Sequence, residues 1–130
     1  RFLLNDACYL AGKTLVSAAL LRFDAQISVF KAHLGPPHPC YRCLFPERPP
    51  DDLIPRCEQA GILGAIAGMV GSLQATEVLK EIMGIGESLS GHLLVYDGLD
   101  TTFRKIKTRR DPACALCGPQ ASIKDLRLSA

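Results

Sequence analysis

Four of the six cysteines in this 130-residue chain form two pairs with the same spacing, Cys40–Cys43 and Cys114–Cys117. Two thiolates separated by two residues can bind one metal ion from a single tight turn. Two such turns supply the four sulfur ligands that tetrahedral zinc prefers. Because 70 residues separate the pairs, a shared ion would bring distant parts of the chain together. No other feature of the sequence constrains the fold as strongly.

The surroundings of the two pairs favour a shared zinc ion over two redox dithiols or a chance match. A thioredoxin-like dithiol lies at the start of a helix that follows a strand, and neither pair has that setting. Pro39 precedes the first pair, Pro112 lies two residues before the second, and Gly118 follows the second. Both pairs are therefore predicted to lie in loops. Since four protein sulfurs leave no open coordination position, we expect a structural site.

The composition is that of an ordinary globular domain. Hydrophobic residues make up 48% of the chain and charged residues 22%, which suits one domain with a buried core. A net charge of +2 is too small to indicate nucleic acid as a partner. No apolar run is long enough to span a membrane. The CxxC spacing and the absence of a signal peptide predict a reducing, cytoplasmic setting.

Periodicity predicts two helices and four strands along the chain. The expected elements are a helix over 2–10, strands over 14–21 and 25–30 joined by a sharp bend, a helix over 61–83 ended by Gly84, and strands over 92–97 and 102–106. The strand over 92–97 is apolar on both faces and is expected in the middle of a sheet. Gly64, Gly68 and Gly71 predict a narrow stripe on which another element packs closely. Arg1 enters the first helix without a cap, so we expect the chain to be part of a longer protein.

The segment over 35–57 contains seven prolines and is predicted to be an extended loop. A metal at Cys40 and Cys43 would pin its early part, and the rest would be free to cover a partner. Cys57 lies at the end of this loop, just before the long helix. Helix amides and Arg56 favour its thiolate, whereas Glu58 opposes it. Cys57 is therefore a candidate covalent carrier, with an incidental loop cysteine as the alternative.

The remaining cysteine and the histidines carry no predicted chemistry. Cys8 lies among apolar residues of the first helix and is expected to be a small buried side chain. His38 is close in sequence to Cys40, but four sulfurs already complete a zinc shell. His33 and His92 have no partner in the sequence pattern.

Five motifs resemble, in order, the second half of the MoeB/ThiF/HesA adenylyltransferases, bacterial relatives of ubiquitin-activating enzymes. They are RFLLNDAC at 1–8, PCYRCLFP at 39–46, CEQAGILG at 57–64, GSLQATE at 71–77 and DPACALCG at 111–118. The resemblance covers residues 1 to about 118 and leaves 119–130 as a tail or linker. It implies an α/β fold with a mixed sheet and helices, the C-terminal portion of a Rossmann-like ubiquitin-activating-enzyme fold with a four-cysteine zinc site.

The resemblance implies a function that this chain would share with a missing half. The family uses ATP and magnesium to adenylate the C-terminal glycine of a ubiquitin-like sulfur-carrier protein, for sulfur transfer toward molybdopterin, thiamine or a related product. The glycine-rich phosphate loop and the magnesium-binding aspartate belong to the N-terminal half and are absent here. By resemblance this chain supplies the zinc ligands, the crossover loop and the candidate catalytic Cys57.

The same resemblance implies a homodimer in which one protomer completes the nucleotide site of the other. We expect the chain to be inactive in adenylation by itself. Two alternatives stay open at the level of sequence. One is a zinc-stapled module that binds a protein tail without catalysis, and the other is a dithiol redox protein without stoichiometric zinc.

Overall fold

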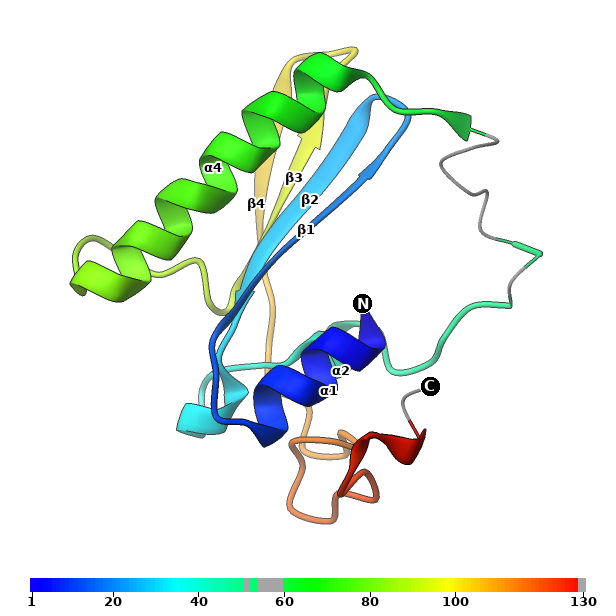
Figure 1. The fold of residues 1–130 in the computed structure, drawn as a ribbon, viewed down its shortest axis with the longest axis vertical. Coiled ribbons are helices and arrows are strands. Elements are labelled where there is room, and N and C mark those ends of the chain that lie inside the picture. Colours follow the sequence, from blue (N-terminus) through cyan, green and yellow to red (C-terminus); the bar gives the residue numbers. More distant parts are fainter. Residues whose placement is uncertain (51, 54–59, 129–130) are drawn as a thin grey trace.

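The computed structural model describes residues 1–50, 52–53 and 60–128. The elements in chain order are α1 (Phe2–Leu10), β1 (Leu15–Leu21), β2 (Asp24–Phe30), the 3-10 helix η1 (Ala32–Leu34), α2 (Tyr41–Leu44), α4 (Gly64–Met83), β3 (His92–Asp97), β4 (Thr102–Lys107) and the 3-10 helix η2 (Leu126–Leu128). Helix α4 lies along the sheet. Helices α1 and α2 and the C-terminal segment lie together near the end of the sheet opposite the turn between β1 and β2 (Figure 1).

The four strands form one sheet in the order β1-β2-β3-β4, and every neighbouring pair is antiparallel. Leu21 pairs with Asp24, so β1 and β2 are joined by the sharp bend that was predicted. Strand β3 lies between β2 and β4, which confirms its central position. The parallel strands of the predicted mixed sheet are not among the described residues, whose sheet is antiparallel throughout.

The core lies between the sheet and α4. Alternate residues of β2 point to this side, and residues four apart on α4 meet them, as periods of two and 3.6 require. The buried cluster contains Ala25, Ile27, Val29, Ile66, Val70 and Leu89. Strand β1, predicted to be buried, is half-buried along its whole length, because it lies at an edge of the described sheet. These contacts fix α4 on one face of the sheet.

No described element packs closely on the α4 glycines, so their predicted role stays a prediction. A Cβ atom at Gly64, Gly68 or Gly71 would meet no described atom within 4 Å outside its own stretch of helix. The three glycines are exposed on the side of α4 that faces away from the sheet. Helix α4 does end at Gly84, which has a left-handed backbone with φ of 63°. No helix among the described residues has the length and hydropathy needed to cross a bilayer.

Candidate metal centre

The structure brings Cys40, Cys43, Cys114 and Cys117 together. Their sulfurs all lie within 4.8 Å of one another. The Sγ–Sγ distances are 3.8 Å for Cys40–Cys43, 3.6 Å for Cys40–Cys114 and 3.4 Å for Cys43–Cys117. Four sulfurs placed about 2.3 Å from a central zinc ion would lie about 3.8 Å from one another. The donor set and its spacing therefore fit a tetrahedral ion.

The first pair is presented by one turn of helix and not by the loop that was predicted. Cys40 precedes α2, and Cys43 lies inside it. Residues three apart share a face of a helix, so the turn directs both sulfurs to one side. The amide of Cys40 also donates to the sulfur of Cys43 at 3.5 Å. The prolines exclude a long helix but still allow this short one between Pro39 and Pro46.

The second pair lies in a turn, as predicted. The amide of Cys114 donates to the carbonyl of Asp111 at 3.1 Å, and the amide of Gly118 donates to the carbonyl of Cys114 at 3.0 Å. A Cβ atom at Gly118 would lie 2.5 Å from that same carbonyl oxygen. Only glycine allows so close an approach of the backbone. Ile123, in the segment assigned to a tail or linker, packs with Leu116 in a second buried cluster beside this turn.

Hydrogen bonds among the four sulfurs shift the pKa values of the thiols in opposite directions. The pKa of Cys114 is lowered, first by its bond with Cys117. The pKa of Cys40 is raised by its bond with Cys114. For Cys43, the sulfur of Cys114 raises the pKa, but those of Cys117 and Cys40 outweigh it and the pKa falls to about 7. Four adjacent sulfurs cannot all carry a negative charge without a cation, and a divalent ion would remove that conflict.

Helix α1 is tied to the first cysteine turn by polar contacts that the sequence did not reveal. The side-chain oxygen of Asn5 accepts a hydrogen bond from the amide of Tyr41 at 2.9 Å. Asp6, which is fully buried, pairs with the guanidinium of Arg42. Arg42 also stacks over the ring of Phe2, 4.9 Å from its centre. In the sequence, the polar pair Asn5–Asp6 in an otherwise apolar helix could have indicated these contacts.

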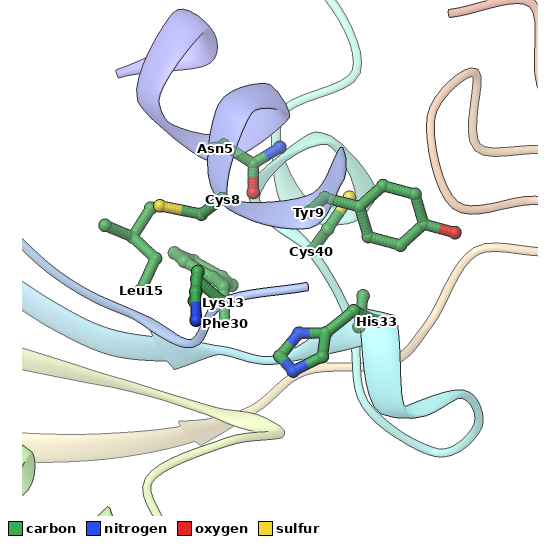
Figure 2. A pocket seen from close by; sticks show the side chains of 9 residues that line it. Asn5, Cys8, Tyr9, Lys13, Leu15, Phe30, His33 and Cys40 are labelled. Atoms are coloured by element: carbon green, nitrogen blue, oxygen red, sulfur yellow. The ribbon is translucent and has the colours of Figure 1, made fainter. Parts of the chain in front are cut away.

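A small cavity lies beside the metal centre, between α1 and the start of β1. It has a volume of about 10 Å³ and is lined by Asn5, Cys8, Tyr9, Lys13, Leu15, Phe30, Ala32, His33 and Cys40. Asn5 points into it, whereas Cys8 points toward Leu15 and away from His33 (Figure 2). Cys8 is half-buried and not fully buried as predicted. The thiol and the imidazole do not face one another, so they form no catalytic pair.

Cys57, the candidate catalytic residue, lies outside the described residues. The chain after it is held at the turn between β1 and β2. There the amide of Arg22 donates to the carbonyl of Gly61 at 3.0 Å, and the amide of Leu63 donates to the carbonyl of Arg22 at 3.1 Å. The described chain thus leaves the metal centre after α2 and rejoins the sheet at its opposite end (Figure 1). The role of Cys57 stays a prediction.

Comparison with known proteins gives consistent results. The model of the ThiF family matches residues 1–116. A sulfur carrier protein adenylyltransferase of Thermus thermophilus is 48% identical over 128 residues, which cover 97% of this chain and 47% of that protein. The adenylyltransferase and sulfurtransferase MOCS3 of Sus scrofa is 49% identical over 128 residues, covering 98% of this chain and 28% of that protein. The chain thus spans about half or less of these relatives.

Solved structures share the fold. A crystal structure of E. coli MccB aligns with a TM-score of 0.70 at 16% identity, over 94% of this chain and 37% of that chain. The microcin C7 biosynthetic enzyme MccB in complex with N-formylated MccA aligns with a TM-score of 0.71 at 15% identity, over 88% of this chain and 36% of that chain. At these identities the likeness shows the fold alone, and it agrees with the predicted α/β class.

Proposed function

The chain belongs to the ThiF family, and on that premise we propose that it is part of an enzyme that adenylates the C-terminal glycine of a ubiquitin-like sulfur-carrier protein. The relative at 48% identity, named a sulfur carrier protein adenylyltransferase, is the observation that carries the proposal. In this reaction a carboxylate oxygen bonds to the α-phosphorus of ATP and pyrophosphate leaves. ATP and magnesium would bind to a part of the enzyme that this chain does not contain.

We propose that the carrier tail lies on the face of the sheet opposite α4. Two adjoining hollows on this face share Arg1, Ala19 and Gln26. Their volumes are about 10 and 170 Å³. Small side chains at Ser17, Ala19 and Ser28 make this face shallow, so the proposed peptide would lie across it. Replacing Ala19 with Phe would fill the hollow and raise the KM for the carrier, whereas Ala11→Phe at the exposed end of α1 would not.

In this proposal zinc is structural. Cys40, Cys43, Cys114 and Cys117 would hold it, and a shell of four thiolates supplies folding energy but no open position for a substrate. Cys8, Cys40, Cys43, Cys114 and Cys117 are free thiols in the structure. Metal-bound thiols persist in a reducing compartment, so we place the enzyme in the cytoplasm.

Cys57 would accept the activated acyl group after adenylation. Its thiolate would attack the acyl carbonyl, a C–S bond would form, and AMP would leave with the oxygen. Support comes from sequence: Cys57 ends the proline-rich segment over 35–57, which is predicted to cover a partner. The chain is anchored to Arg22 through Gly61, four residues later. A Cys57→Ser variant would therefore keep ATP–pyrophosphate exchange and lose the thioester adduct with the carrier, which added thiols cleave. Retention of that adduct would assign Cys57 an incidental role.

A homodimer would use the uncovered side of α4. Leu79, Ile82 and Met83 are 54, 75 and 57% exposed, and the glycine stripe continues this surface toward the start of the helix. Such a run of apolar and small residues is typical of a helix that packs closely on a partner. In this proposal a second copy would pack against the exposed glycines, which have no partner among the described residues.

The decisive test is ATP–pyrophosphate exchange that depends on the carrier. The full-length protein is expected to catalyse exchange, and the 130-residue chain alone is not. Carrier binding without exchange by the full-length protein would instead support the zinc-stapled docking module. Robust exchange by the 130-residue chain would contradict the assignment of the nucleotide site to another part of the protein.

A further inference from the structure

Arg110 connects three separate segments around the candidate metal centre. Its Nη1 atom donates to the carbonyl of Ala32 at 2.8 Å and to that of His38 at 2.9 Å. Its Nη2 atom donates to the carbonyl of Cys117 at 2.7 Å. The first two acceptors lie 78 and 72 residues away in sequence. One guanidinium thus joins η1, the segment that leads into Cys40, and the last residue of the second cysteine pair.

We propose that Arg110 is a positioning residue for zinc, which holds the two cysteine turns at the separation that the ion requires. The inference rests on the zinc site of the proposed function and not on adenylation. The two turns come from segments that are far apart in the sequence, and their sulfurs lie 3.4 to 3.8 Å apart. Before the ion arrives, only contacts within the protein hold the two turns together. The hydrogen bonds of Arg110 cross-link the two backbones and so keep the turns from moving apart.

The chemistry of arginine suits this position. The guanidinium is planar, is always charged and presents five N–H donors in a fixed fork. Lysine has a single nitrogen at the end of a flexible stem and cannot reproduce bonds that diverge from two nitrogens. All three partners of Arg110 are carbonyls, so its positive charge is not neutralised by them. A zinc ion with four thiolates carries a net charge of about −2, which a nearby cation stabilises.

The adjacent residue provides a matched control. Arg109 is exposed, whereas Arg110 is half-buried. Replacing either with Lys keeps the charge and changes the donor geometry only. The measurement is the rate at which zinc-loaded full-length protein transfers its metal to a chromophoric chelator at neutral pH. We expect Arg110→Lys to release zinc about tenfold faster than the wild type, and Arg109→Lys to release it at the wild-type rate.

Cobalt-loaded Arg110→Lys should keep the sulfur-to-cobalt charge-transfer band of four thiolates, because the ligands are intact. The unfolding midpoint, compared with the rate of zinc release, separates positioning of the turns from general stabilisation of the fold. A residue that only stabilised the fold would lower the unfolding midpoint of the variant and leave zinc release from the folded protein unchanged. Zinc release from Arg110→Lys at the rate of Arg109→Lys would overturn the proposal. Since no readout uses ATP or the carrier, loss of the adenylation proposal would leave this result intact.

Arg110→Ala extends the test. It is expected to release zinc at least as fast as Arg110→Lys, because it removes all three bonds and the charge. Where Arg110→Ala does not fold, Arg110→Lys decides the question, since it keeps the aliphatic stem and the charge. Wild-type protein that binds no zinc would overturn the proposal as well.

Discussion

The carboxylate of Asp6 accepts two hydrogen bonds from the guanidinium of Arg42, at 2.8 Å from Nε and 2.7 Å from Nη2. Asp6 lies on α1, and Arg42 lies between the two cysteines of the first pair. Both oxygens are engaged in the planar, two-point geometry that makes such pairs strong. These hydrogen bonds also raise the pKa of Arg42 above its ordinary value. The first helix and the first cysteine turn therefore behave as one unit.

Asp6→Asn is expected to lower the free energy of unfolding by about 3 kcal/mol, because it leaves a largely buried guanidinium without its full countercharge. Denaturation by urea measures the change. The matched control is Asp125→Asn, which breaks the exposed pair with Arg127 and should leave stability unchanged. Equal effects of the two substitutions would show that the Asp6–Arg42 pair does not hold α1 against the metal centre.

A second ion pair predicts a dependence on pH. Lys31 contacts Glu81 at 2.9 Å, and Ser88 also donates to that carboxylate. Burial by itself raises the pKa of Glu81, but the hydrogen bonds from Ser88 and Lys31 outweigh it, so the pKa lies below its usual 4.5. The pair therefore contributes stability above that value and loses it as the pH falls through the lowered pKa.

Comparison of the wild type with Glu81→Gln isolates this contribution. The difference in free energy of unfolding should be about 1.5 kcal/mol at pH 7 and should shrink toward zero as the pH falls well below 4. Loss of zinc at low pH affects both proteins and cancels in the difference. A difference that grows on acidification would contradict the assigned direction of the pKa shift.

The uncovered side of α4 predicts an effect on oligomeric state. Ile82→Glu places a charge in the apolar surface proposed for the dimer and should shift the full-length protein toward monomer by at least tenfold in dissociation constant. Sedimentation equilibrium measures it. Leu99, which is 76% exposed in the turn between β3 and β4, is the control, and Leu99→Glu should not change the assembly. An unchanged dimer with Ile82→Glu would place the interface elsewhere.

Local sequence predicted what depends on local physics. The CxxC spacing indicated which sulfurs meet, Gly84 indicated the end of α4, and alternation indicated β2. The contacts of Asp6 with Arg42 and of Arg110 with Ala32 could not be predicted, because they join residues that are 36 and 78 positions apart. The glycine stripe of α4 predicts a close neighbour that no described residue supplies. The spacing of the glycines shows that a neighbour fits there but does not identify it.

The most direct test of the zinc site is the metal content of freshly purified protein, measured by elemental analysis together with X-ray absorption at the zinc edge. We expect about one zinc per chain with four sulfur neighbours at about 2.3 Å, and loss of that metal in Cys114→Ser. Protein that is folded, has all four thiols reduced and contains no metal would contradict this expectation.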